Sequence, residues 1–413
     1  MPRTMPYGSK SYVDEKEMEF VEVEVKEFPT SVAMDISYNT YLVASDGRLY
    51  LGTCRQNGSA HLLAYDPRED KILDLANMDE VIPDYGRGYA GQGKIHTPLC
   101  EGADGKIYGA THMDILYPFW VSFYDVYGYQ GGHWFCYDPK TGKCTDLGLA
   151  IPREGVLTMA MDKERQILYG ISWPRGYLLA YDIATGRTEN KGRATINLSR
   201  FMLCMSDGTV FFTGRNGYIT TYQPGKCFIE HLPVRVNRRI GPLYQRDIGP
   251  DTVFTAPVEW ERAKSFLAFV FRSGDLFKYD KTEGKIEYYE LFNEETYCNV
   301  QSVVASDKKV YYALPGDVGA AGPNHSGRIF RFDPATGVNE LVGYMRCGKL
   351  NQFFHIGGGA IGADGTMYWF TLTPRDAKKG YITTEEFSST ADPFCLTRPL
   401  LIIYKPKEVS NGK

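Results

Sequence analysis

The stretch "ADGKIYGAT" (103–111), followed by "WFCYDPKTG" (134–142), decides the fold, because both patterns recur along the chain. In the first, Asp-Gly supplies the positive-φ position that a hairpin turn needs, and an apolar strand follows. In the second, an apolar strand ends in an Asp-Pro-x-Thr-Gly turn. One copy of each pattern therefore predicts a unit of short antiparallel strands.

The unit is repeated along the whole sequence. Copies of the first pattern start at residues 45, 103, 162, 206, 306 and 363, and "SFLAFVFRSG" (265–274) takes the fifth position. Copies of the second pattern start at residues 62, 134, 178, 219, 276, 329 and 401. Four short strands per unit, at a spacing of roughly 40–70 residues, are typical of a propeller blade. We therefore predict an all-β fold, a seven-bladed β-propeller.

The two ends of the chain indicate how the propeller closes. The last copy, "LIIYKPK" (401–407), leaves no room for a fourth strand, whereas "EFVEVEVKEF" (19–28) alternates as a strand does. We predict that this N-terminal strand completes the last blade and closes the ring, which removes exposed edges. Residues 1–18 then form an N-terminal tail, and residues 19–413 form a single propeller domain.

Composition limits the classes of partner. The 413 residues carry a formal net charge of −4, which gives no reason to expect nucleic acid or an anionic membrane as partner. Nine cysteines without a Cys-x-x-Cys pair favour reduced thiols. The first twenty residues lack the apolar run of a signal peptide, so we expect a cytoplasmic protein, or a periplasmic or secreted one if a leader has been removed.

The long connections are expected on one face of the propeller. Both repeated turns are short and lie on one face of the propeller. The long insertions lie on the other face, at 76–95, 113–132, 232–262, 315–327 and 373–398. Long loops on one face of a rigid ring are where a site is expected.

Two of the seven histidines, His96 and His112, stand at the ends of one predicted hairpin, "GKIHTPLCEGADGKIYGATHMD" (93–114). A two-residue turn would leave them one step out of register. A three-residue turn with Gly105 in the left-handed conformation would place them directly opposite, about 5 Å apart, and we favour it. We predict a functional role for this pair. His61 and His231, in the outer parts of blades, are expected to be structural, and His133 is open to either reading.

Other polar and aromatic residues are expected around the same mouth. Strand starts contribute Glu154, Arg200, Asn299 and His355, and loops contribute Arg175, Arg215, Arg239, Trp120 and Tyr124. Aromatic rings stack on sugar C–H faces, and guanidinium groups hold a carboxylate. These residues therefore predict an anionic oligosaccharide or polysaccharide as substrate. The arginine-rich segment that contains Arg239 is as consistent with a solvated loop as with a substrate clamp.

The stretch "HTPLCEGADGKIYGATH" (96–112) resembles the paired-histidine hairpin of the seven-bladed propeller polysaccharide lyases, such as ulvan lyases and rhamnosyl-glucuronate lyases. The resemblance covers the propeller as a whole, and oligogalacturonate lyases share it. It implies a catalytic role for His96 and His112. It also implies that Arg175 is the arginine that holds the uronate carboxylate.

The chemistry of such lyases suits these residue types. The enzyme removes the proton at C5 of a uronate and expels the group on O4. A cation on the carboxylate favours the enolate-like intermediate, and histidine is a base of suitable strength. A tyrosine or a second histidine protonates the leaving oxygen, and Tyr244 is the tyrosine we name.

Two points remain open: whether the site holds a metal, and whether the protein has one of two other functions. Oligogalacturonate lyases use a Gln-x-x-His-x-His metal cluster, but Gly357 stands where its last histidine would be. A divalent metal held by Gln352, His355 and His325 is an alternative to a metal-free site. A propeller sugar-acid lactonase or hydrolase, and a non-catalytic binding propeller, are the alternative functions, because this fold does not choose among them.

Overall fold

The computed structural model describes most of the chain: residues 18–56, 58–82, 91–113, 128–195, 199–236, 253–271, 275–289, 301–304, 307–315, 326–376 and 396–406. Within these residues the regular structure is nearly all β, apart from helix α1 (Met78–Val81) and a 3₁₀ turn, Arg215–Gly217. None of the helices in these ranges is long and apolar enough to span a membrane. The chain divides into two compact units, Pro29–Asn299 and Met1–Phe28 with Val300–Lys413.

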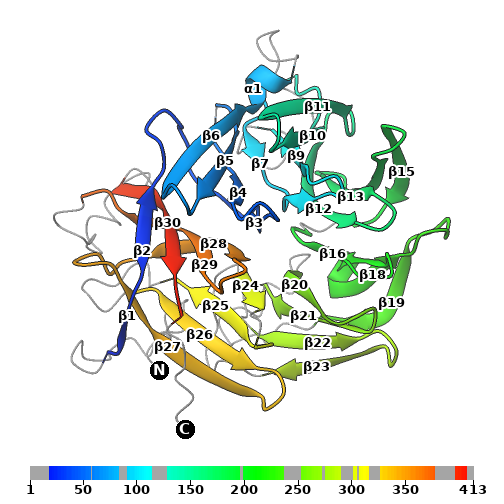
Figure 1. Ribbon diagram of the computed structural model, residues 1–413. Coiled ribbons are helices and arrows are strands. Elements are labelled where there is room, and N and C mark those ends of the chain that lie inside the picture. The colour runs from blue at the N-terminus through cyan, green and yellow to red at the C-terminus, as the bar shows by residue number, and fades with distance from the viewer. Residues whose placement is uncertain are drawn as a thin grey trace. The chain divides into compact units, whose positions relative to one another are not determined.

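The unit Pro29–Asn299 contains five antiparallel sheets along the chain (Figure 1). The first comprises β3 (Leu42–Val43), β4 (Leu49–Gly52), β5 (His61–Asp66) and β6 (Lys71–Asn77). The second comprises β7 (Lys94–Ile95), β8 (Cys100–Glu101), β9 (Ile107–His112), β10 (His133–Asp138) and β11 (Lys143–Leu149). The third comprises β12 (Gly155–Asp162), β13 (Ile167–Trp173), β14 (Tyr177–Asp182) and β15 (Arg187–Arg193).

The last two sheets of this unit follow the same order. The fourth comprises β16 (Met202–Cys204), β17 (Val210–Thr213), β18 (Tyr218–Tyr222) and β19 (Glu230–Arg235). The fifth comprises β20 (Phe254–Glu261), β21 (Ser265–Val270), β22 (Leu276–Asp280) and β23 (Lys285–Tyr289). The predicted insertion 232–262 is therefore shorter than expected, because β19 and β20 take both of its ends.

The second unit contains two sheets. One comprises β24 (Gln301–Val304), β25 (Val310–Leu314), β26 (Arg328–Asp333), β27 (Val338–Arg346) and β1 (Phe20–Glu22). The other comprises β28 (Phe354–Ile361), β29 (Met367–Pro374), β30 (Thr397–Tyr404) and β2 (Glu24–Glu27). With the five sheets above, the described residues form seven blades, which confirms the predicted seven-bladed β-propeller.

The repeated turns are built as their sequences predict. In the Asp-Gly turns the aspartate carboxylate accepts the amide N–H two residues on, as in Asp46, Asp104, Asp207 and Asp364, and Asp307 does the same in an Asp-Lys turn. In the second turn the glycine amide donates to the aspartate carbonyl, as Gly142 does to Asp138 at 2.8 Å. That glycine has a φ of +71°, a conformation that disfavours other residues.

The N-terminal segment completes the last blade, as predicted, but it also does more. Strand β2 pairs antiparallel with β30, with Val25 opposite Ile402. The preceding strand β1 adds in parallel to β27, so one alternating segment serves two sheets. Between the two strands, the amide of Val23 donates to the carbonyl of Arg346 at 2.9 Å.

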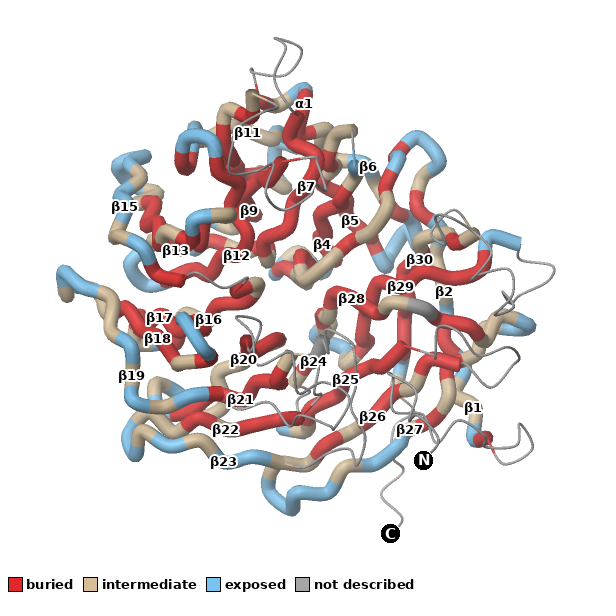
Figure 2. Tube along the Cα trace, turned by 180° about the vertical axis from the view of Figure 1, so that it is seen from behind, coloured by how far each residue is buried: buried red, intermediate tan, exposed pale blue. Residues whose placement is uncertain are grey.

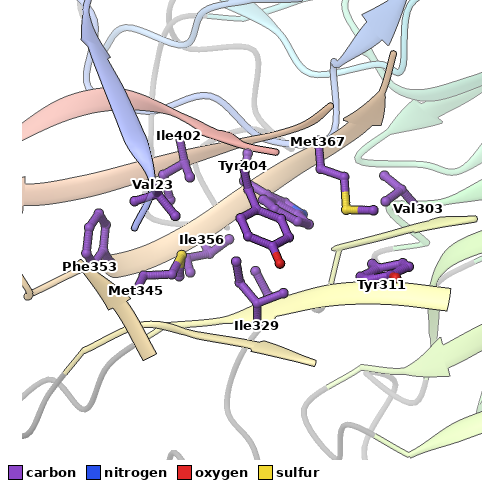
Figure 3. Packing of buried hydrophobic residues seen from close by; sticks show 12 residues of the cluster. Val23, Val303, Tyr311, Ile329, Met345, Phe353, Ile356, Met367, Ile402 and Tyr404 are labelled. Carbon is purple, nitrogen blue, oxygen red and sulfur yellow. The ribbon is translucent and has the colours of Figure 1, made fainter. Parts of the chain in front are cut away.

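Burial differs between the second strands and the outermost strands of the blades. In Figure 2, strands β9, β17 and β21 are buried, whereas the outermost strands β15, β19 and β23 are largely exposed. Apolar clusters lie between neighbouring sheets of a unit, and Figure 3 shows Val23 packed with Ile402, Ile356 and Met345. Full burial of such a side chain contributes roughly 1.5–3 kcal/mol.

Candidate active site

The hairpin that carries His96 and His112 has the predicted turn but not the predicted register. Gly105 has a φ of +76°, and the three-residue loop before Lys106 is closed by the bond from the Gly102 amide to the Lys106 carbonyl. Cys100 of β8 lies opposite Tyr108 of β9, whereas Lys94 of β7 lies opposite His112 of β9. Two extra residues are therefore accommodated between β7 and β8.

The expectation that the two histidines lie directly opposite each other is wrong, because the strand is interrupted at residues 96–99. There the Thr97 hydroxyl replaces a main-chain partner and accepts the Ala110 amide at 3.1 Å. The two imidazole rings nevertheless meet, with centroids 6.3 Å apart. The structure thus brings His96 and His112 together by the interruption and not by regular pairing.

His96 is buried and its orientation is fixed. Its Nδ1 lies 2.9 Å from the Leu157 carbonyl in β12. Because a carbonyl only accepts, Nδ1 carries the proton, and in the neutral ring Nε2 holds the lone pair. The ring also packs on Tyr38, with centroids 4.5 Å apart. His96 therefore presents Nε2 as a base.

His112 is also buried, and it is held by packing. Its ring lies against Trp173, with centroids 5.6 Å apart, and Nδ1 makes a long contact of 3.4 Å with the Met113 carbonyl. A Cβ added to Gly155 would lie 2.5 Å from Cγ of His112. The ring therefore depends on a glycine at the start of β12.

Both imidazoles are kept neutral. Burial, together with the charges of Arg200 and Lys94, lowers the pKa of His96 to about 3. Burial, with Lys94 and His96, holds the pKa of His112 well below its usual range. Burial and nearby cations are the chief influences on the pKa of both rings, so neither imidazole is charged.

Arg175 pairs with Glu154. Its Nη1 lies 3.1 Å from Glu154 Oε1, and its amide donates to Oε2 at 3.2 Å. The Ser172 hydroxyl donates to the same oxygen at 2.6 Å. Glu154 is fully buried, whereas 47% of the Arg175 side chain is exposed. Arg175 is thus anchored by a buried carboxylate and keeps part of its guanidinium at the surface.

Three other described histidines, His61, His133 and His231, have hydrogen-bond partners within their own blades. His61 bonds Asp74 at 3.0 Å, and His133 bonds Asp146 at 2.9 Å. His231 lies 2.8 Å from the Thr220 hydroxyl. Each of these pairs joins two neighbouring strands beside a register shift, so the structural roles expected for His61 and His231 are consistent with these contacts, and His133 fits the same description.

The remaining predicted residues divide into two groups. Arg215 is exposed in the 3₁₀ turn, His355 is the extra residue of a bulge in β28, and Gln352 is buried just before that strand. Outside the described residues lie Trp120, Tyr124, Arg239, Tyr244, Asn299 and His325. Among described residues, no group of three His, Cys, Asp or Glu side chains could hold a metal. Gln352 and His355 alone do not complete a donor set, so the proposed metal site depends on His325.

Sequence reasoning named Arg200 among the residues near the site but missed three other neighbours of the two rings, Tyr38, Trp173 and Lys94. Tyr38 precedes the first blade, outside any repeat, and contacts His96 only through the fold. Trp173 and Lys94 had weak signals, because one stands beside Arg175 in "SWPRGY" and the other is an isolated charge in a buried strand, "GKIH". Their position next to the histidines comes from the packing of neighbouring blades.

Comparison with known proteins supports the fold. No family model matches the sequence, and no curated protein matches it. Among solved structures, a fungal alcohol oxidase in complex with copper is 12% identical, over 93% of this chain and 76% of that chain, with a TM-score of 0.58. Virginiamycin B lyase from Staphylococcus aureus is 8% identical, over 93% and 100%, with a TM-score of 0.55. A chain of a mitotic checkpoint complex is 10% identical, over 97% and 96%, with a TM-score of 0.57. At these identities the likeness concerns the propeller alone.

Proposed function

We propose that the protein is a carbohydrate-active lyase that cleaves a uronate-containing glycan by β-elimination. Glucuronate glycans, rhamnose-capped ones included, are the first candidates. The observation that carries the proposal is the meeting of two buried, neutral imidazoles beside cations and aromatic rings. Neutral imidazole accepts a proton, the cations favour an anionic sugar, and the rings offer stacking surfaces.

The geometry suggests a route for the proton. Nε2 of His96 takes the proton from C5, the C–H electron pair forms the C4=C5 double bond, and the C4–O4 bond breaks. The departing oxygen then receives the proton from His96, directly or through His112. Both histidines end as they began, so the elimination needs no other reactant. Tyr244 remains the candidate for an alternative proton donor.

The low pKa of His96 follows from burial and from the charges of Arg200 and Lys94. A base that titrates near 3 is weak for this task. A substrate carboxylate would add negative charge beside the ring, and a nearby opposite charge favours the protonated imidazole. Substrate binding would thereby raise the pKa of His96 toward the range that suits a general base.

The hydrolase and the binding reading are less well supported. A metal-dependent lactonase or hydrolase needs acidic ligands at the strand starts, and Glu154 has both oxygens engaged by Ser172 and Arg175. A purely binding propeller gives no reason to bury two neutral histidines next to each other. The fold itself is neutral on this question, since it occurs in an oxidase, a lyase and a checkpoint assembly.

The test is an absorbance assay on a panel of glucuronate and galacturonate glycans that includes rhamnose-capped arabinogalactan. Elimination creates a C4=C5 double bond conjugated to the carboxylate, which absorbs in the ultraviolet where the substrate does not. We expect the wild type to raise the absorbance on at least one glycan, and His96→Ala and His112→Ala to abolish the rise. Sugar release without absorbance would indicate a hydrolase instead, and full activity in both variants would overturn the site.

A further inference from the structure

The carboxylate of Glu154 accepts three hydrogen bonds from residues 172–175, at the connection from β13 to β14. The Ser172 hydroxyl and the Arg175 amide donate to Oε2 at 2.6 and 3.2 Å, and Nη1 of Arg175 lies 3.1 Å from Oε1. The Ser172 oxygen in turn accepts the Tyr177 amide at 2.9 Å. One buried side chain therefore fixes the connection between the two strands.

The same connection also contacts His112. Gly155, which follows Glu154, lies opposite Trp173 in the register of β12 and β13. The His112 ring packs on Trp173, with centroids 5.6 Å apart, and a Cβ on Gly155 would lie 2.5 Å from its Cγ. The Glu154 carbonyl accepts the Gly132 amide of the second blade at 2.8 Å. Glu154 therefore stands where the connection, the start of β12 and His112 meet.

Arg175 keeps donors for a ligand while it is held by Glu154. Its amide and one guanidinium nitrogen bond the carboxylate, and 47% of its side chain is exposed. A guanidinium carries five N–H groups in a rigid fork that matches a carboxylate. Because an unpaired buried carboxylate is strongly unfavourable, Glu154 and Arg175 stay together. The guanidinium is thereby presented in one orientation, two residues along the chain from Trp173.

We propose that Glu154 is a positioning residue of this site, which holds Arg175 in the orientation that binds the carboxylate of a uronate next to His112. This inference rests on the proposed function, because it takes a uronate as the ligand. Glu154 touches neither the sugar nor the transferred proton, and it acts through Arg175. The role requires a carboxylate, because an amide accepts at one end only and would meet one of the three donors with its own N–H groups.

The experiment uses D-glucuronate as probe and D-glucose as its uncharged counterpart, with binding followed by NMR titration into the millimolar range. We expect the wild type to bind glucuronate and not glucose. Arg175→Met should weaken glucuronate binding about tenfold or more, the usual loss for a hydrogen bond to a charged group. Glu154→Gln should weaken it about two- to tenfold, the cost of ordering one long side chain on binding.

The combined variant tests whether Glu154 acts through Arg175. In an Arg175→Met background, Glu154→Gln should cost no further affinity, because no guanidinium is left to hold. A merely structural role would lower the affinity in both backgrounds. Ser172→Ala serves if Glu154→Gln does not fold. It removes one of the three donors, and it should weaken glucuronate binding in the presence of Arg175 but not in the Arg175→Met background.

The matched control is Glu101→Gln. Glu101 makes the same kind of contact elsewhere, because its carboxylate accepts the Ser45 amide at 3.0 Å, between the first and second blades. This variant should bind glucuronate like the wild type.

The outcomes separate this inference from the proposed function. An equal loss from Glu154→Gln in both backgrounds, or tighter glucuronate binding by Glu154→Gln, would overturn the positioning role even if the wild type is a lyase. Failure of the wild type to bind glucuronate would also overturn it, and the absorbance assay would still decide the lyase. A loss that depends on Arg175, without elimination on any glycan, would support the positioning role and overturn the lyase.

Discussion

Two groups of histidines in this propeller are bonded in different ways. His61 and His133 sit at the start of the third strand of their blades, each bonded to an aspartate thirteen positions later. In the second blade His112 ends β9 and His96 lies in the break after β7, and among the described residues neither ring is hydrogen-bonded to a carboxylate. Histidine therefore links two strands at a bulge in the first group, and forms a pair of neutral imidazoles in the second.

The difference lies in what each ring faces. An aspartate at Nδ1 fixes an imidazole by a bond to a charged acceptor, and in these two blades that bond links neighbouring strands. A main-chain carbonyl fixes His96 at Nδ1 and leaves Nε2 with its lone pair. Partner type, more than burial, thus separates the two groups, because His133 is as buried as His96.

The largest expected effect tests whether this comparison is functional. On a glycan that the wild type cleaves, His112→Ala should lower kcat by roughly 100- to 10,000-fold, the usual contribution of general acid–base catalysis. His133→Ala should leave kcat within a few-fold of the wild type, because its ring bonds Asp146. Steady-state absorbance assays at saturating substrate measure both values. Equal losses in the two variants would erase the distinction between the groups.

A second effect follows from the pKa of His96, which is lowered from an ordinary value of 6.5 to about 3 in the folded protein. Between these values the unfolded chain binds a proton that the folded protein does not, so stability is lost as the pH falls from 6.5 toward 3. In His96→Asn, which keeps a donor for the Leu157 carbonyl, that loss is absent. Between pH 7 and pH 4.5 the wild type should therefore lose about 2–3 kcal/mol more than the variant.

Urea unfolding of both proteins at the two pH values measures this difference. The carboxylates that also titrate over this range are common to both proteins, so they cancel in the comparison. Parallel losses of unfolding free energy would show that His96 is not kept neutral by the fold, and the basic pair would lose its main physical support.

The sequence predicts the blades better than it predicts the site. Repeated Asp-Gly and Asp-Pro turns are local chemistry, so they predict seven blades without knowledge of packing. The N-terminal strand was expected as one element, because its alternation runs unbroken through Val23. Its pairing partners, β27 and β30, divide it into β1 and β2. Pairing partners are distant in sequence, so the pattern does not reveal them.

The histidine pair shows the same limit at a finer scale. A hairpin with a histidine at each end predicts that the rings meet, and they do. The register was wrong because the interruption after Ile95 depends on the Thr97 hydroxyl. Tyr38 precedes the first blade and Trp173 belongs to the third, so their contacts with the rings follow from tertiary packing, which the repeat does not encode.

A third prediction concerns the setting of His112. In Gly155→Ala the new methyl group would lie 2.5 Å from Cγ of His112, so the ring must move or the variant loses stability. We expect a cost of about 1–3 kcal/mol in unfolding free energy, as for other overpacked cores, and a fall in kcat. In a His112→Ala background the same substitution should cost clearly less and leave the residual kcat unchanged. If the two effects simply add, the methyl group acts elsewhere.

The smallest effects compare the two structural histidines with each other. His133 and Asp146 have 6% and 19% of their side chains exposed, and His61 and Asp74 have 13% and 32%. Loss of the more buried bond leaves an aspartate with less access to water, so His133→Ala should cost about 1–2 kcal/mol. His61→Ala should cost only about 0.2–1 kcal/mol, as for a pair that water partly reaches. Urea unfolding at neutral pH resolves the order of the two costs. The reverse order would mean that the bulge of the first blade depends more on its histidine than burial indicates, and burial would then be a poor guide to the structural histidines as well.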